Sequence, residues 1–210
     1  SYLFNNLITN LGTSNNDMSG RAVKTGGSGD KINGVTYIFN NTFDNEQIAI
    51  DNCNYQGPEY HSVTRNNILI SRTGKRAMSN TTTDERDSND YDLMSGIVNV
   101  KAGDEANGLT GLAQYKDAAN GDYTLAEGSP DIDSGVYLPN FSDGKTVGSA
   151  PDMGALELGG KTGFLPSRPI ALSTNRYRIE LKNGEEAEVE VYVGDIENNL
   201  TYSILKNRDF

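Results

Sequence analysis

The sequence predicts an all-β chain that coils on itself, and a recurring short pattern is the main reason. In each copy, a run of aromatic or β-branched residues leads into two asparagines, after which a second apolar run begins. The asparagine pairs are Asn5-Asn6, Asn40-Asn41 and Asn66-Asn67. Repeats of this kind mark units that bury their apolar faces only by stacking on one another. The copies lie about 26 to 35 residues apart, close to the length of one β-solenoid coil.

The composition agrees with a thin core made of short strands. Hydrophobic residues account for only 35% of the 210 residues, which is little for a thick globular core. The 23 glycines and the many asparagine, aspartate, serine and threonine residues predict frequent tight turns. Six short segments rich in β-branched or aromatic residues are expected to be strands. They span residues 2–4, 35–39, 47–50, 62–65, 68–71 and 97–100.

The asparagine pairs are expected to form the turns between strands. Asparagine tolerates the left-handed backbone region and can bond neighbouring backbone groups. When coils stack, asparagine amides at equivalent positions can also bond along the stack, as side-chain ladders do in cross-β structures. The pairs therefore predict both the turn and a polar ladder that joins the coils.

The second half of the chain divides into three parts. Residues 80–90 form a polar segment that predicts a surface loop, after which residues 91–96 re-enter the core. Residues 121–158 contain Ser129-Pro130 and several turn glycines, and we expect them to cap the last coil. The repeating coils and this cap together span residues 1–158. Residues 159–169 are predicted to be a linker.

The residues after the linker change pattern. Two alternating segments flank Asn183-Gly184, which is a strong hairpin signal. Residues 170–210 therefore predict the start of an immunoglobulin-like β-sandwich. Because such domains need about 100 residues, this part of the sequence predicts only a partial domain.

The charge and the single cysteine limit the possible partners. A net charge of -11 disfavours nucleic acid and anionic membranes, but it permits Ca²⁺ binding. Cys53 has no cysteine to pair with inside the chain. No apolar stretch reaches transmembrane length. Because the chain begins in a strand pattern without Met, we expect a signal peptide and earlier coils to precede Ser1.

The end of the repeat region resembles a known family. The segment Gly128-Ser129-Pro130-Asp131-Ile132-Asp133-Ser134-Gly135, followed by Pro151-Asp152-Met153-Gly154-Ala155-Leu156-Glu157, is similar to a "GSPAIDAG … PDxGAxE" ending. That ending closes many secreted bacterial right-handed parallel β-helix proteins, including pectate lyases of the family-nine type. The resemblance implies a right-handed parallel β-helix, a secreted or cell-surface location and action on uronic-acid polysaccharides. In such lyases Ca²⁺ neutralises the uronate, and a lysine or arginine removes the C5 proton.

The resemblance leaves several activities open, because lyases, hydrolases and adhesin-like proteins share this ending. A polysaccharide lyase is favoured over a glycoside hydrolase, since no opposed pair of carboxylates can be identified. The alternative is a non-catalytic carbohydrate-binding or adhesin-like protein. The candidate substrate contacts are Arg65, Arg72, Lys75 and Arg76. No catalytic residue or Ca²⁺ ligand can be assigned, and the catalytic coils are expected to precede residue 1.

Two further features are expected to have ordinary structural roles. The single histidine, His61, is expected to be a satisfied surface or turn residue rather than a catalytic base. Asp131, Asp133 and Asp152 belong to the closing motif, so we expect them to cap turns rather than to bind a metal ion.

Overall fold

A computed structural model shows stacked parallel strands and almost no helix. It describes residues 1–11, 20–25, 34–45, 47–52, 60–80, 84–142 and 144–160. The helix in these residues is a single 3-10 turn, η1 (Ala118–Asn120). The structure is therefore all-β and is consistent with a parallel β-helix, as the repeats predict. The predicted β-sandwich and the linker beyond residue 160 lie outside the described residues.

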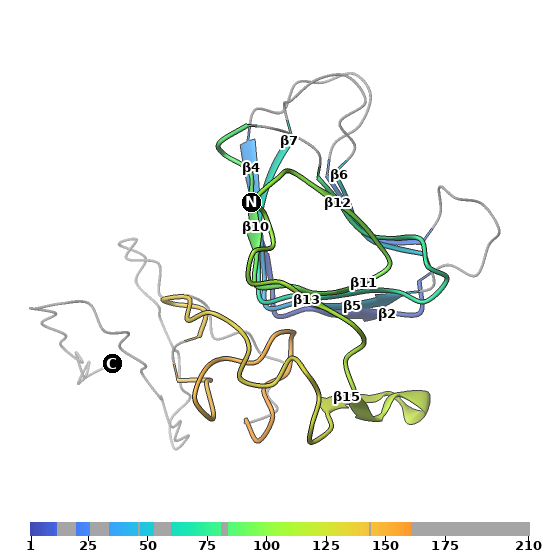
Figure 1. Cartoon of the computed structure of the whole chain (residues 1–210). Helices are drawn as coiled ribbons and strands as arrows, with labels where there is room; N and C mark the ends of the chain where they lie inside the picture. The colour runs from blue at the N-terminus through green and yellow to red at the C-terminus, as the bar shows by residue number, and fades with distance from the viewer. Residues whose placement is uncertain are drawn as a thin grey trace, which may run out of the picture. The chain divides into compact units, whose positions relative to one another are not determined.

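Each of four coils contributes one strand to each of three parallel sheets, and one more strand extends the second sheet (Figure 1). Sheet 1 contains β1 (Tyr2–Phe4), β4 (Gly34–Phe39), β7 (Tyr60–Arg65) and β10 (Ser88–Asp90). Sheet 2 contains β2 (Leu7–Thr9), β5 (Thr42–Asn45), β8 (Ile68–Ser71), β11 (Leu93–Ser95) and β13 (Leu109–Thr110). Sheet 3 contains β3 (Arg21–Thr25), β6 (Ile48–Asn52), β9 (Arg76–Asn80) and β12 (Ile97–Val100). All six predicted strands are confirmed, with ends that differ by no more than about two residues.

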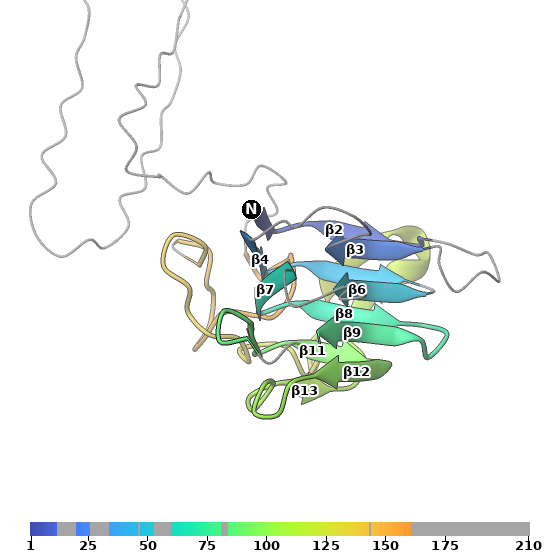
Figure 2. The same ribbon diagram turned by 90° about the horizontal axis from the view of Figure 1, so that it is seen from above.

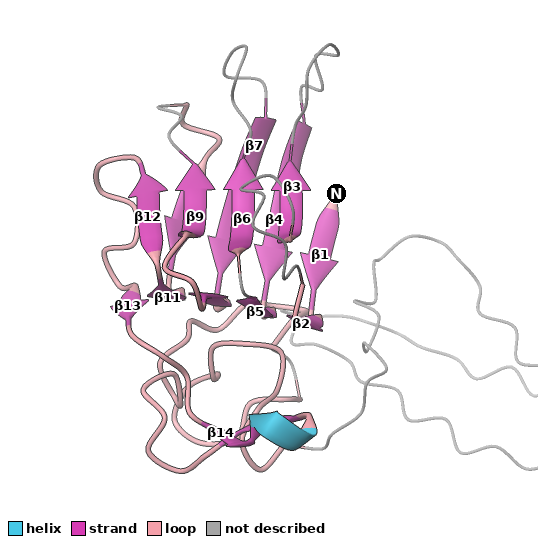
Figure 3. Ribbon diagram, turned by 90° about the vertical axis from the view of Figure 1, so that its right-hand side faces the viewer, coloured by secondary structure: helices cyan, strands magenta, loops and turns pink. Residues whose placement is uncertain are grey.

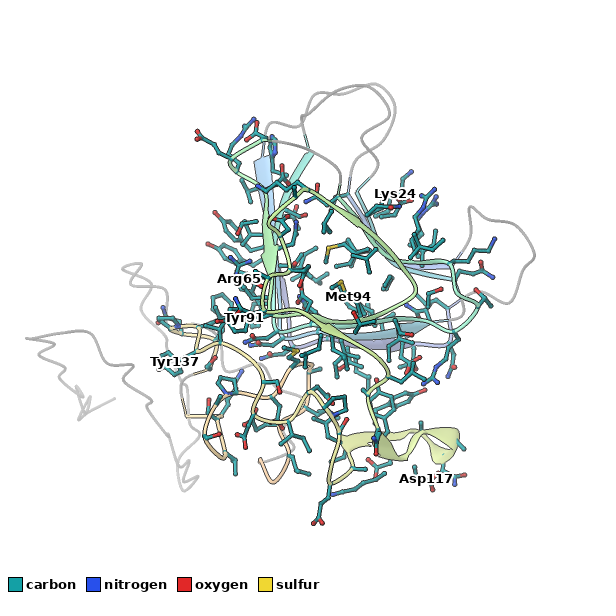
Figure 4. The ribbon with its side chains drawn as sticks, in the orientation of Figure 1. Lys24, Arg65, Tyr91, Met94, Asp117 and Tyr137 are labelled. Atoms are coloured by element: carbon teal, nitrogen blue, oxygen red, sulfur yellow. The ribbon has the colours of Figure 1, made fainter. Side chains whose placement is uncertain are left out.

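The coils stack in chain order, as Figure 2 shows from β2 and β3 at one end to β12 and β13 at the other. Apolar side chains from all three sheets point into the space between them. The buried residues of this interior include Ile38, Phe43, Ile50, Leu69, Met78 and Met94. Met94 is visible inside the triangle of sheets in Figure 4. The core is thus a column that is filled one layer per coil, which explains why a modest apolar content suffices.

The first asparagine of each pair makes the turn from sheet 1 to sheet 2. Asn5, Asn40 and Asn66 have φ angles of 54°, 51° and 57°. Asparagine adopts this left-handed conformation at less cost than most residues. The fourth coil turns at the same place with Tyr91, whose φ is 59°. The predicted turn is therefore confirmed, and it occurs once more than the asparagine pairs indicate.

The second asparagine of each pair forms the predicted ladder. The side-chain Oδ1 of Asn41 accepts from the backbone N–H of Asn6 at 3.0 Å and from its Nδ2 at 2.9 Å. Asn67 accepts the same two bonds from Asn41, at 3.0 and 2.9 Å. Asp92 accepts them from Asn67, at 2.7 and 2.8 Å. The ladder is therefore one continuous chain of hydrogen bonds across four coils.

Residues 111–142 and 144–160, which we call the flanking segment, pack along the outer face of sheet 2 (Figure 3). They include the antiparallel hairpin of β14 (Tyr115–Asp117) and β15 (Asp122–Leu125). Leu125 and Met153 pack with Ile68, Ile70 and Leu93 in a second core cluster. Residues 121–158 are predicted to cap the last coil, whereas these contacts lie along the side of the stack. The reason is that sheet 2 carries apolar residues on its outer face as well as inside.

Close approach of the backbone anchors this segment to the coils. Gly154 donates its N–H to the carbonyl oxygen of Asn66 at 2.7 Å, and Ala155 donates to Thr42 Oγ1 at 3.0 Å. Gly154 has a φ of 102°, and a Cβ at this position would lie 2.6 Å from Ile68 Cδ1 and 2.8 Å from Thr42 Oγ1. A glycine is therefore required both by the backbone conformation and by the available space.

Candidate functional site

Three of the four predicted substrate contacts lie on one turn, and the fourth lies on a different face. Arg72 and Lys75 connect β8 to β9, and Arg76 is the first residue of β9. Arg65 ends β7 in sheet 1. The four side chains therefore do not form one cluster.

Arg65 links the third coil to the fourth. Its Nη1 donates to the carbonyl oxygens of Thr64 and Ser88 at 2.6 and 2.9 Å, and its Nη2 donates to Ser88 Oγ at 2.8 Å. A guanidinium group has five N–H donors, so these three bonds leave donor capacity on a side chain that is only partly buried.

Arg72 and Arg76 each pair with an aspartate of the preceding coil. Arg72 binds the buried Asp44 through two hydrogen bonds of 2.6 Å, from Nε and Nη2. This hydrogen bonding raises the pKa of Arg72 above its usual value. Arg76 Nη1 lies 3.6 Å from Asp51 Oδ1, whose other oxygen is 2.6 Å from Arg21 Nε. These pairs cross-link successive coils, and a raised pKa makes Arg72 a poorer base.

The outer face of sheet 1 carries a stack of aromatic rings, which we call the aromatic face: Tyr2, Phe4, Tyr37, Phe39 and Phe141. The register pairs Tyr2 with Tyr37 and Phe4 with Phe39 on adjacent strands. The two tyrosine rings are stacked, with centroids 4.8 Å apart and planes 15° from parallel. Phe141, from the flanking segment, meets Phe4 and Phe39 edge-on at 5.1 and 5.2 Å. Tyr2 is 62% exposed, so this stack offers an aromatic surface to solvent.

A small pocket adjoins the aromatic face. Its lining includes Phe141, Lys145, Asp152 and Glu157 of the flanking segment and the turn residues Asn5 and Asn40. Burial lowers the pKa of Lys145, and its ammonium group makes no ion pair with another described residue. Burial raises the pKa of Glu157 to about 7, although the carboxylate accepts backbone N–H groups of Val147 and Asp152. A desolvated lysine and a carboxyl group with a raised pKa thus line one pocket, and perturbed groups of this kind are candidates for acid–base chemistry.

His61 lies in a buried polar cluster at the start of β7. Its Nδ1 is 2.8 Å from Asp87 Oδ2, and its Nε2 is 4.0 Å from Asp84 Oδ2. A tight turn brings the two aspartates together, since the N–H of Asp87 donates to the carbonyl oxygen of Asp84 at 3.2 Å. The group of His61, Asp84 and Asp87 could hold a metal ion, and it is the only such group of three in the part of the chain that the structure describes.

A second pair of acids lies at the end of the asparagine ladder. Asp92 is fully buried and accepts from Thr64 Oγ1 at 2.5 Å as well as from Asn67. Glu105 Oε2 accepts the N–H of Asp92 at 3.3 Å. Burial raises the pKa of both groups, and the charge of Asp92 raises that of Glu105 further, so the pair retains one proton, on Glu105, at neutral pH.

Two of the three aspartates of the closing motif, Asp133 and Asp152, accept backbone N–H groups at turns, as expected, whereas Asp131 accepts from Ser129 Oγ. Asp133 Oδ1 accepts the N–H groups of Ser149 and Ala150 at 2.8 and 3.1 Å, which hold the pKa of Asp133 below its usual value. Asp152 accepts the N–H groups of Asp133 and Leu158 at 2.8 and 2.7 Å. These oxygens are committed to backbone groups, which agrees with a structural role.

Sequence reasoning assigned no role to Lys145, Phe141 or the tyrosine stack. Nothing local marks Lys145, because its pocket forms only when the flanking segment packs on the coils. The His61–Asp87 pair had a usable signal, since the two residues are separated by 26 positions, which is also the separation between Asn41 and Asn67. Residues one coil apart are neighbours in a stack of this kind.

Comparison of the chain with protein-family models, with curated proteins and with solved structures gave no match. The resemblance to pectate lyases therefore remains a prediction. Within the described residues, no helix has the length and apolar character needed to cross a bilayer.

Proposed function

We propose that this chain is part of an extracellular polysaccharide-active protein of the right-handed parallel β-helix type, and that its aromatic face contacts the glycan. The stack of the exposed Tyr2 ring on the half-buried Tyr37 ring is the observation that carries the proposal. Aromatic rings with a polar hydroxyl suit ligands that have an apolar face and a polar rim, and sugar rings have both.

The direction of the stack suits a chain-like ligand. Tyr2 and Tyr37 lie on adjacent strands, and the same row continues through Val63 and Ser88 in the next two coils. Strands in a sheet are about 4.8 Å apart, so the row runs along the stack of coils. A glycan laid along this row would contact the tyrosines first and then meet Arg65, which follows Phe4 and Phe39 in the neighbouring row.

Arg65 favours a uronic-acid glycan over a neutral one. Its remaining N–H donors would bind a carboxylate in the planar geometry that guanidinium groups prefer. A net charge of -11 opposes the approach of a polyanion, so we propose that Ca²⁺ bridges the acidic protein and the uronate groups.

Lys145 favours a second candidate function, cleavage by β-elimination. Burial lowers the pKa of Lys145, which favours the unprotonated amine, the form that can remove a proton next to a carboxylate. Glu157 lines the same pocket and, in protonated form, would supply a proton to the departing sugar oxygen. This pocket shares Phe141 with the aromatic face, so one glycan chain could contact both.

The test measures glycan binding and cleavage on the full chain. Polygalacturonate and a neutral galactan are titrated by calorimetry with and without Ca²⁺, and ultraviolet absorbance follows any unsaturated product. Tyr2→Ala should weaken polygalacturonate binding by about 2- to 10-fold. The control Leu112→Ala, a 49% exposed apolar residue outside the aromatic face, should leave it unchanged.

Arg65→Gln and Lys145→Met separate the two functions. The first should reduce the preference for polygalacturonate over galactan. The second should abolish product formation without loss of binding. Equal polygalacturonate binding by wild type and Tyr2→Ala would contradict the proposal that the aromatic face contacts the glycan. Binding without product formation would favour a non-catalytic carbohydrate-binding protein.

A further inference from the structure

His61 is held in the way that proteins hold a metal-binding histidine. The side chain is completely buried, and its Nδ1 is 2.8 Å from Asp87 Oδ2. Asp87 is itself fixed, because its Oδ1 accepts the N–H of Ser62 at 2.8 Å and Nδ2 of Asn80 at 3.0 Å. A carboxylate only accepts hydrogen bonds, so in the neutral imidazole Nδ1 carries the proton and Nε2 presents its lone pair.

The Nε2 atom has no hydrogen-bond partner among the described residues, although it is buried. A buried nitrogen without a partner normally costs free energy. The atom lies 4.0 Å from Asp84 Oδ2. An ion with bonds of about 2.0–2.2 Å to a histidine nitrogen and to a carboxylate oxygen fits between two atoms at this separation. Both the orphaned nitrogen and the acidic group opposite it therefore point to a cation.

We propose that His61 Nε2 and Asp84 bind a divalent first-row transition ion of the Zn²⁺ class, with Asp87 orienting the imidazole. A carboxylate that accepts the other ring N–H is the usual outer partner of a metal-bound histidine. Imidazole suits Zn²⁺ and its neighbours, whereas Ca²⁺ requires six to eight oxygen ligands. This site is separate from the aromatic face and does not depend on the glycan proposal.

One cation of the protein, Arg86, competes for the Asp84 carboxylate, and a second, Lys101, lies beside the same turn. Arg86 binds both oxygens of Asp84, from Nε at 2.8 Å and from Nη2 at 2.7 Å. These bonds hold the pKa of Asp84 well below its usual range. The Lys101 ammonium donates to the backbone carbonyl oxygens of Asp84 and Asp87. Since the Arg86 side chain is 42% exposed, it can turn into solvent when an ion takes its place.

This competition gives the proposal a sharp test. ZnCl₂ is titrated by calorimetry into the full chain after chelator treatment, and Co²⁺ is added separately to read the coordination from its visible absorption. The wild type should bind about one equivalent of Zn²⁺. Asp84→Asn should weaken binding at least about 10-fold. Arg86→Gln should strengthen binding, because it removes the competing cation, and a purely structural role would not produce that gain.

The remaining variants keep the test decisive. His61→Gln should abolish binding, and because this buried residue could be needed for folding, the partly exposed Asp84 provides the independent variant. Cys53→Ser removes the only thiol and should bind Zn²⁺ like the wild type. Wild-type affinity in Asp84→Asn, or displacement of Zn²⁺ by an equal concentration of Ca²⁺, would overturn the proposal.

Discussion

The acid pair at the end of the asparagine ladder predicts a stability that falls as pH rises. Asp92 and Glu105 both have raised pKa values in the folded protein, to about 6 and about 10. A carboxyl group with a raised folded pKa binds more protons in the folded state than in the unfolded state. Its contribution is therefore present at low pH and is lost as pH rises from the unfolded value towards the folded one. Glu105→Gln removes this titration and keeps an amide that can both accept from the N–H of Asp92 and donate to its carboxylate.

The magnitude follows from the proton that the pair retains. Between pH 6 and pH 8 the unfolded chain has released the Glu105 proton and the folded protein has kept it, so stability falls by about 1.4 kcal/mol per pH unit. Two units give an upper bound of about 3 kcal/mol, and water near the partly exposed Glu105 side chain should reduce this to about 1–3 kcal/mol. The variant should match the wild type near pH 4.5 and exceed it in stability at pH 8.

Urea unfolding at a series of pH values measures the difference. Circular dichroism or tyrosine fluorescence can follow the transition, since the chain has 11 tyrosines and no tryptophan. Glu127→Gln changes an exposed carboxyl group and serves as the control. If wild type and Glu105→Gln lose stability in parallel from pH 6 to pH 8, the shared-proton reasoning is wrong.

Three further substitutions test the packing of the coils and of the flanking segment. Asn67→Ala should cost at least about 3 kcal/mol of unfolding free energy, because it leaves several buried partners without hydrogen bonds. A loss below about 1 kcal/mol in a urea titration would show that the ladder contributes little to stability. Gly154→Ala should cost about 2–3 kcal/mol of unfolding free energy through backbone strain and the clash with Ile68. It should also make residues 111–160 more sensitive to limited proteolysis, and an unaltered cleavage pattern would contradict this prediction. Arg72→Gln should cost about 2–4 kcal/mol by leaving the buried Asp44 carboxylate unpaired, and Asp44→Asn in the same chain should recover part of it. A double-mutant cycle by thermal unfolding that shows no coupling would reject the pair.

The repeating part of the fold could be predicted from sequence because local and stacked interactions agree there. Asn5, Asn40 and Asn66 mark the turn, and their successors mark the ladder. The fourth coil was missed as a repeat because Tyr91 and Asp92 occupy the two positions. Tyrosine rarely adopts a left-handed conformation, whereas aspartate can still accept the ladder bonds. The repeat was recognised by its identical asparagines. The fold, however, requires only a residue with a left-handed backbone at the first position and a hydrogen-bond acceptor at the second.

The placement of the flanking segment and of the candidate site depends on long-range packing. Ile68, Leu69 and Ile70 are all buried, which is typical of a strand covered on both faces. That uninterrupted apolar run was the available clue that something covers sheet 2, but it does not say which segment does so. The Tyr2–Tyr37 stack depends on a register across 35 residues, and loop lengths alone do not determine register.

The ladder also has a polarity that restricts how coils can be added to this architecture. Each ladder asparagine, Asn6, Asn41 and Asn67, donates to the acceptor one coil further on, and Asp92, which has no side-chain donor when ionised, ends the series. A duplicated coil inserted before Asn67 would accept hydrogen bonds from the asparagine of the preceding coil and donate to Asn67 Oδ1. It could therefore join the ladder without disturbing its neighbours. The same insertion after Asp92 would break the sequence of bonds. The stack is therefore extensible from one side only, and the aspartate acts as its terminator.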